Sequence, residues 1–191
     1  MQSKKSEYVA LEDLVRTRYA SVAWTHKIQE KQAEIYDKRY RILATVNIFA
    51  ASITSAGIFS LIFTDQTWLK ITSAVVSFVT IFISALLKSF DLQSMAKANK
   101  ATATKLVELR DELQTLILKI KMREQPVCSL TDEFEALQKR VHVVYSDAPK
   151  TTDAAVKMAE EALKIYGDNT FTDKEIDMML PDSLNRREKD E

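Results

Sequence analysis

Residues 42–63 read ILATVNIFAASITSAGIFSLIF, which is 22 consecutive positions without an ionisable side chain. A helix of that length is about 33 Å long, enough to cross the ~30 Å hydrocarbon core of a membrane. A second uncharged run, residues 71–87, gives 17 more positions, and residues 68–69 extend it if Lys70 turns its ammonium group outward. Only a short turn separates the two runs. The sequence therefore predicts a transmembrane hairpin with spans at 42–63 and about 68–87.

The alternative, a hairpin buried in a soluble core, is disfavoured because two uncharged runs of this length rarely adjoin in soluble domains. The rest of the composition points to helices. The chain has 191 residues, two glycines and three prolines, and no proline precedes Pro126. The 27 basic residues balance the 27 acidic ones, so no overall positive field attracts nucleic acid. We expect an all-α membrane protein with long cytoplasmic extensions in a helical bundle or coiled coil.

Basic residues gather at the open end of the predicted hairpin. They are Lys38, Arg39 and Arg41 before the first span, and Lys88, Lys97 and Lys100 after the second. The connecting turn offers only Asp65 and Lys70, so the positive-inside rule places both termini in the cytoplasm. The side chains expected at the membrane interfaces are Tyr36, Tyr40, Arg41 and Lys88 on the inner side and Trp68 on the outer side.

Polar side chains form a stripe on the second span. Its members, spaced four, three and four residues apart, are Ser73, Ser77, Thr80 and Ser84. In the first span Asn47 is the side chain that costs most in hydrocarbon, so it should face a partner or water. Two interpretations stay open: these residues pack the helices closely, or they line a pore. One hairpin cannot enclose water, so a pore requires several copies of the chain.

No glycine or proline breaks residues 88–125, which predict a long cytoplasmic helix. A heptad seam runs along it: Leu92, Ala96, Asn99, Ala103, Leu106, Arg110, Leu113, Ile117 and Ile120. We expect the seven apolar members to drive self-association. Asn99 and Arg110 are either register-setting contacts or partly exposed positions, and the second is favoured. The sequence leaves open whether this helix continues the second span as one rod.

The remaining segments are assigned from their caps and charges. Residues 1–41 predict a cytoplasmic helix that packs back on the 88–125 helix. Residues 126–184 predict short helices, with capping boxes beginning at Ser129 and at Thr172. The charged tail, residues 185–191, is expected to be disordered.

Catalytic chemistry is not indicated. His26 and His142 lie far apart and have no ligand at metal spacing, and the lone cysteine, Cys128, belongs to no motif. No glycine-rich phosphate loop is present. We therefore predict no enzyme, no metal and no cofactor. Basic and aromatic residues at 36–41 favour lipid headgroups over nucleic acid because they adjoin a span.

The whole layout resembles a known family. A cytoplasmic helix ends in Lys38-Arg39-Tyr40-Arg41, a Ser/Thr-rich hairpin follows at 42–87, and a long helix follows at 89–124. This arrangement resembles the SLATT family, the two-transmembrane effectors found beside SMODS nucleotidyltransferases and SLOG sensors in bacteria. The resemblance covers roughly residues 10–165. It rests on architecture, and the segment after Pro126 looks less typical.

The resemblance implies an effector of a bacterial anti-phage or conflict system. Such a protein oligomerises, permeabilises the inner membrane on activation and causes growth arrest or cell death. It implies a partner encoded nearby, either a sensor, a nucleotidyltransferase or a reverse transcriptase, and no catalytic residues. The alternative is a membrane-anchored helical scaffold without a pore. A channel for physiological ion traffic is disfavoured, because nothing resembles a selectivity filter.

Overall fold

Every regular element in the described part of the chain is an α-helix. The computed structural model describes residues 2–60, 66–168 and 170–179. The helices are α1 (Gln2–Ser60), α2 (Thr67–Phe90), α3 (Leu92–Met122), α4 (Val127–Ser146), α5 (Asp153–Lys164) and α6 (Asp173–Met179). The prediction of an all-α chain is confirmed. The expected end of the first span at 61–63, the turn at 64–65 and the tail at 185–191 lie outside the described residues.

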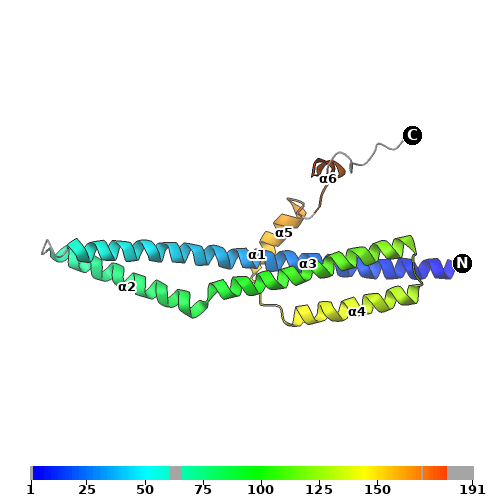
Figure 1. Ribbon diagram of the computed structural model, residues 1–191, viewed down its shortest axis with the longest axis horizontal. Coiled ribbons are helices and arrows are strands. Elements are labelled where there is room, and N and C mark those ends of the chain that lie inside the picture. The colour runs from blue at the N-terminus through cyan, green and yellow to red at the C-terminus, as the bar shows by residue number, and fades with distance from the viewer. Residues whose placement is uncertain (1, 61–65, 169, 180–191) are drawn as a thin grey trace.

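α1 is a single helix of 59 residues that runs along most of the molecule (Figure 1). No proline interrupts it, and its one glycine, Gly57, lies near its end. The predicted N-terminal helix and the first apolar run are therefore one continuous element. This continuity ties the two ends of the molecule together through backbone hydrogen bonds.

α2 returns beside the second half of α1, and α3 continues in the same direction along the first half (Figure 1). A single residue, Asp91, separates them, and its φ of 38° lies in the left-handed region. Its carboxylate accepts a hydrogen bond from the Ser94 amide at 3.1 Å, which caps α3. The second apolar run and the long helix are thus two helices joined by an elbow, not one rod.

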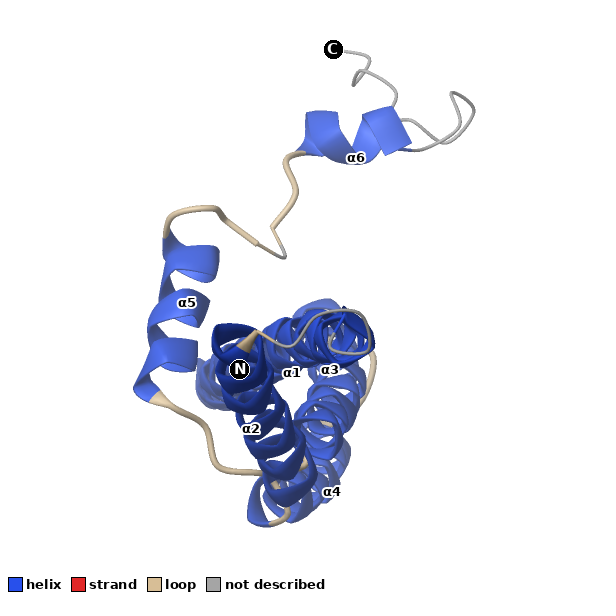
Figure 2. Ribbon diagram, turned by 90° about the vertical axis from the view of Figure 1, so that its left-hand side faces the viewer, coloured by secondary structure: helices blue, strands red, loops and turns tan. Residues whose placement is uncertain are grey.

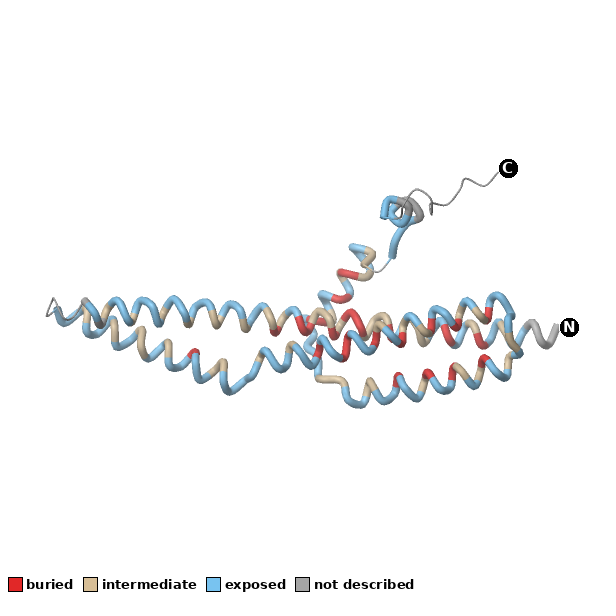
Figure 3. Tube along the Cα trace, in the orientation of Figure 1, coloured by how far each residue is buried: buried red, intermediate tan, exposed pale blue. Residues whose placement is uncertain are grey.

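The apolar core lies between α3, α4 and the first half of α1, where the buried positions gather in Figure 3. Its members are Leu11, Val15 and Val22 of α1, Leu106, Leu109, Leu113, Leu116 and Ile120 of α3, and Leu130, Phe134, Leu137 and Val141 of α4. Large aliphatic side chains of this kind each contribute about 1.5–3 kcal/mol when fully buried. The bundle therefore folds around its own core and leaves the α1–α2 end of the molecule exposed.

The C-terminal helices test the two capping boxes. The box at Ser129 was wrong, because α4 begins at Val127, directly after Pro126, and Ser129 bonds the Gln125 side chain instead. Pro126 holds the N-cap position with an extended ψ of 146°, and α4 has no side-chain cap. The box at Thr172 is confirmed: the Thr172 amide donates to Glu175 Oε2 at 2.8 Å, and the Glu175 amide donates to Thr172 Oγ1 at 3.4 Å. Figure 2 shows α5 beside α1 and α6 standing away from the bundle.

Substitution of Asp91 should move the elbow. Asp91→Ala removes the cap and puts alanine in a left-handed conformation that costs about 1–2 kcal/mol, while alanine favours a continuous helix. We expect α2 and α3 to straighten, so that spin labels at the exposed residues Ile81 and Thr104 move farther apart. Pulsed electron paramagnetic resonance in a Cys128→Ser background measures that distance. Asp91→Asn keeps a side-chain oxygen and should match the wild type; an unchanged distance in Asp91→Ala would contradict the elbow.

Candidate functional site

The facing surfaces of α1 and α2 meet through polar and small side chains. Asn47 of α1 and Ser84 of α2 form a reciprocal pair, in which Asn47 Nδ2 donates to Ser84 Oγ at 3.0 Å and Ser84 Oγ donates to Asn47 Oδ1 at 3.2 Å. An amide in an apolar helix is costly unless it has a partner, and Ser84 supplies one. This pair fixes the register of the two helices near the elbow.

A close approach fixes the register toward the other end. A Cβ atom built on Gly57 would lie 2.5 Å from Ser73 Oγ, closer than real side chains come. A Cβ atom at this position would force the Ser73 hydroxyl to turn away, while Ser73 Cβ would stay in ordinary contact at 3.6 Å. Gly57 thus lets α2 approach α1 closely with Ser73 in its present rotamer, as at small-residue helix contacts in membranes. The constraint is steric, since the backbone of Gly57 is helical.

The predicted stripe on α2 lies on the side that faces α1. Ser73 meets Gly57, Ser84 bonds Asn47, and Ser77 and Thr80 between them are partly buried. The hydroxyls of the last two donate to carbonyls of their own helix, Ser73 O at 2.8 Å and Val76 O at 2.9 Å. Within one chain these residues therefore act in packing. Pore lining is a property of an assembly and stays a prediction.

The outer surface of the hairpin is apolar and exposed. On α2 the exposed fractions of Val75, Phe78 and Phe82 are 58%, 71% and 56%. An 18-residue window within Thr67–Met122 is apolar enough to cross a membrane, and only 6% of it is buried. Soluble monomers rarely expose a contiguous apolar surface of this extent. By its length and composition, this helix fits a lipid environment.

The Gly57–Ser73 contact can be tested by a two-residue cycle. Gly57→Ala should destabilise the hairpin by about 1 kcal/mol, because overpacking outweighs the gain in helix propensity. Adding Ser73→Ala removes the clashing hydroxyl and leaves a contact of 3.6 Å, so stability should return to the wild-type level or above. Thermal unfolding in detergent measures both changes. If the double variant is as unstable as Gly57→Ala alone, the close approach is not the cause.

The predicted oligomer seam lies largely inside the chain. Ala103, Leu106, Leu113 and Ile120 are buried, and Leu92, Ala96 and Ile117 are partly buried. The buried members face α1 and α4 of the same chain. Whether the seam also associates copies stays a prediction. The expectation for Asn99 was wrong, since it is 1% exposed, whereas Arg110 is partly exposed as expected.

The predicted interface side chains differ in their surroundings. Trp68 is 62% exposed, and its indole Nε1 donates to Gln66 Oε1 at 2.6 Å. Lys88 is exposed, and Arg41 is exposed and forms an ion pair with Asp37 one turn earlier. Tyr40 is partly buried, and Tyr36 is buried within the chain. Tyr36 is therefore packed inside the protein in this conformation.

A belt of buried polar side chains separates the hairpin from the apolar core of the bundle. We call it the polar belt; its members are His26, Lys27, Gln29 and Gln32 of α1, and Asn99 and Thr102 of α3. Sequence analysis missed the two glutamines, because a glutamine on a long helix has the pattern of an exposed residue. Polar side chains are buried only where hydrogen bonds or ion pairs offset the free energy of removing them from water.

The polar belt holds the segment that carries α5 against α1. Gln32 Oε1 accepts from the Thr152 amide at 2.7 Å and from Thr152 Oγ1 at 2.8 Å. Gln29 Nε2 donates to the Pro149 carbonyl at 3.1 Å. The face of α5 that is buried is formed by small side chains, Ala155, Ala159 and Ala162. α5 is therefore attached mainly by directional bonds, with little apolar area.

The belt is not fully satisfied. Four buried polar atoms of the described residues have no hydrogen-bond partner: His26 Nδ1, Gln29 Oε1, Gln32 Nε2 and Asn99 Oδ1. The belt lies between the α1–α2 hairpin and the apolar core.

Charges in the belt are strongly coupled. Lys27 Nζ lies 2.8 Å from Glu30 Oε2 and 3.2 Å from Asp168 Oδ2. Burial lowers the pKa of Lys27, but the bonds and charges of Glu30 and Asp168 outweigh it and raise that pKa. Burial raises the pKa of Glu30, but Lys27 outweighs it and the pKa is lowered. Both groups are therefore held in their charged forms.

His26 responds in the opposite sense. Burial lowers its pKa below the usual value of 6.5; Glu30 opposes this, and Arg110, Lys27 and Lys100 add to it. A base whose pKa is lower in the folded state destabilises that state when it must take up a proton. The stability that the neutral His26 contributes is therefore fully present above pH 6.5. It is lost as the pH falls from 6.5 through the lower pKa that His26 has in the folded state.

We predict an acid-sensitive stability caused by His26. As the pH falls from about 7 to about 5.5, the Tm of the wild type should fall more than that of His26→Gln, because only the wild type carries a buried imidazole with a lowered pKa. The stability that comes from the lowered pKa of Glu30 is lost only below the usual pKa of 4.5. The stability that comes from the raised pKa of Lys27 is lost only above the usual pKa of 10.5. Neither group therefore changes stability in this pH range. Thermal unfolding in detergent measures it. Equal slopes for the two proteins would contradict the assignment to His26.

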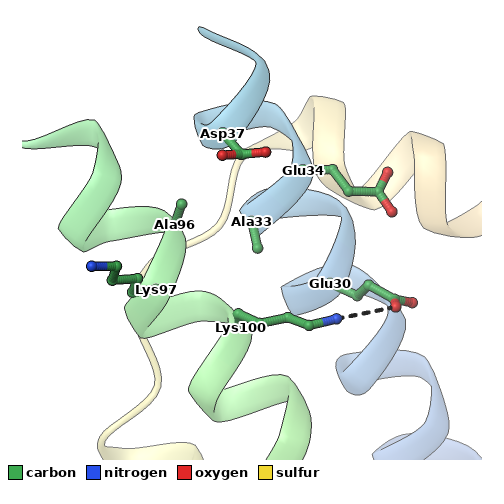
Figure 4. A pocket seen from close by; sticks show the side chains of 7 residues that line it. All are labelled: Glu30, Ala33, Glu34, Asp37, Ala96, Lys97 and Lys100. Atoms are coloured by element: carbon green, nitrogen blue, oxygen red, sulfur yellow. Dashed lines mark ion pairs between the residues drawn. The ribbon is translucent and has the colours of Figure 1, made fainter. Parts of the chain in front are cut away.

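A charged groove of about 300 Å³ lies beside the belt, between α1 and α3 (Figure 4). It is lined by Glu30, Ala33, Glu34 and Asp37 of α1, and by Ala96, Lys97 and Lys100 of α3. Lys100 Nζ lies 3.7 Å from Glu30 Oε1 across the groove, while Glu34 pairs with Lys31 and Asp37 with Arg41. In the described residues, no three His, Cys, Asp or Glu side chains gather as they would to hold a metal ion.

These features define a class of protein: an all-helical chain in which a packed bundle carries an exposed apolar helix. The sequence profile of the SMODS and SLOG-associating 2TM effector domain family 4 matches residues 11–175. The chain belongs to this family. The match extends through α5 and into α6, so the expectation that residues after Pro126 are less typical was wrong. No curated protein and no solved structure matches the chain.

Proposed function

We propose that this protein is a membrane effector of a bacterial conflict system. On activation its hairpins assemble and permeabilise the inner membrane, which causes growth arrest or cell death. The family description, a 2TM effector domain, supports a membrane role. The observation that carries the proposal is the two-sided character of α2. It exposes Val75, Phe78 and Phe82, whereas on the stripe Ser73, Ser77 and Thr80 are partly buried and the exposed Ser84 bonds Asn47 of α1.

The stripe can leave α1 at low cost. The hydroxyls of Ser77 and Thr80 already bond carbonyls of α2, so they lose no partner when α2 turns. The Asn47–Ser84 pair breaks and the packing of Ser73 against Gly57 is lost, but Asn47 and Ser84 can each bond water instead. Several copies that turn their stripes toward a shared axis would enclose a polar path. The apolar outer face would then stay in contact with lipid.

The proposed topology places both termini and the bundle in the cytoplasm. Lys38, Arg39, Arg41 and Lys88 cluster at the end of the hairpin nearest the bundle, as the positive-inside rule requires. The bundle is then accessible to a cytoplasmic partner. We expect that partner to be a sensor, a nucleotidyltransferase or a reverse transcriptase encoded nearby. The name of the family, which refers to association with SMODS and SLOG, supports a partner of this kind.

The rival function is a membrane-anchored scaffold whose hairpin only tethers the bundle. The single-chain packing of the stripe is equally compatible with it. The two functions differ in one respect, because only an effector passes ions or dye when the protein assembles. Leak is therefore the property that separates them.

We predict that Ser77→Leu combined with Thr80→Val blocks most of the leak caused by the wild type. Both changes make α2 more apolar, so insertion should survive while a polar wall is lost. The assay is membrane depolarisation in cells that express the protein at rising levels, with its flanking genes and with phage. The amount of protein in the membrane fraction is measured for each variant.

Val75→Ser combined with Val79→Ser is the matched control, since these residues lie on the exposed face of α2. It should leak like the wild type. A wild-type protein that never depolarises the membrane under any of these conditions would favour the scaffold. Equal leak from the stripe variant and the wild type would place the pore wall elsewhere, with the Asn47 face of α1 as the next candidate.

A further inference from the structure

A cleft opens where α1 and α2 separate above the elbow. It has a volume of about 430 Å³ and is lined by Arg39, Ile42 and Leu43 of α1, Leu86 and Phe90 of α2, and Leu92 of α3. Five of the six lining residues are apolar. The cleft is open, since Ile42 and Phe90 are 53% and 60% exposed, and an acyl chain laid in it would remove this apolar surface from water. It is suited to a hydrocarbon chain.

The charged member of the lining is Arg39, which is exposed and forms no ion pair within the described residues. Its neighbour Arg41 differs, because Asp37 already pairs with it. Lys38 precedes Arg39, Lys88 lies two residues before Phe90, and neither forms an ion pair in the described part of the chain. The carboxylate nearest in sequence to the lining residues is Asp91, which accepts the Ser94 amide, so unpaired cations outnumber unpaired anions around these segments.

We propose that this cleft binds one anionic phospholipid of the inner leaflet. Its acyl chain lies between α1 and α2 against Leu43 and Leu86, and its phosphate bonds Arg39. A guanidinium matches a phosphate with two parallel hydrogen bonds, and an anionic headgroup gains further from the nearby lysines. The inference rests on the membrane insertion in the proposed function, because only then does the cleft open at the inner interface.

The bound lipid also supports the bent elbow. Phe90 and Leu92 lie on either side of Asp91, and both line the cleft. An acyl chain between α1 and this elbow holds the base of α2 away from α1. Straightening of the elbow would change the cleft, so the lipid binds the bent conformation more tightly. Anionic lipid thus stabilises the resting state of the hairpin.

The test uses the full-length protein in detergent, with dioleoyl-phosphatidylglycerol or dioleoyl-phosphatidylcholine added, and native mass spectrometry to count bound lipids. The wild type should bind one phosphatidylglycerol about tenfold more tightly than phosphatidylcholine. Arg39→Gln should lower the affinity for phosphatidylglycerol by about that factor. Leu43→Trp, which fills the cleft without a change in charge, should lower the affinity for both lipids.

Two matched controls make the result specific. Arg41→Gln removes a charge two residues away that is already paired, and Ile48→Trp adds the same bulk at an exposed position outside the cleft. Neither should change affinity more than about threefold. Equal losses in Arg39→Gln and Arg41→Gln would overturn the site, as would wild-type affinity in Leu43→Trp. Displacement of the lipid by an equal concentration of inorganic phosphate would show a free-anion site and also overturn it.

The outcome is separable from that of the proposed function. If the protein is recovered in the membrane fraction and permeabilises the membrane, but binds both lipids equally, only the lipid-site proposal is overturned. A protein that does not extract with the membrane overturns both.

Discussion

The backbone of α1 passes without interruption through two different environments. Its first half buries Val15 and Val22 in the apolar core, and its second half exposes apolar side chains such as Ile48 and Phe49. Because a helix is held by a hydrogen bond at every residue, the two halves share one axis and one rotational phase. The position of the hairpin relative to the bundle follows from this constraint. The polar belt lies where one environment gives way to the other.

The second arm of the hairpin is built differently. α2 and α3 meet at Asp91, so this arm has a joint where α1 has none. A rigid arm beside a jointed one gives α2 a defined way to move while the bundle and α1 stay in place. The contacts that hold α2 against α1 include the Asn47–Ser84 pair and the approach of Gly57 to Ser73. In the proposed function, a signal that reaches α3 would act on the stripe through this joint.

Hydropathy and helical periodicity were enough to predict the all-α class, the apolar runs and a long helix at 88–125, most of which is α3. They could not place the elbow, because neither glycine nor proline marks it and the left-handed conformation of Asp91 depends on packing. A heptad pattern is the same whether its partner is another chain or α1 of the same chain, so the seam did not reveal its partner. Gln29 and Gln32 bond the segment that leads to α5, and no local pattern encodes where that segment lies.

In the proposed topology the hairpin spans the membrane and the bundle lies in the cytoplasm, and two thiols can test it directly. The native thiol, Cys128, is exposed at the start of α4 and reports on the bundle. Gln66→Cys in a Cys128→Ser background reports on the exposed N-cap of α2 at the far end of the hairpin. With a membrane-impermeant maleimide on intact spheroplasts, the account predicts labelling of the thiol introduced by Gln66→Cys, and labelling of Cys128 only after the membrane is permeabilised. Labelling of Cys128 in intact spheroplasts, or protection of the Gln66→Cys thiol until permeabilisation, would contradict it.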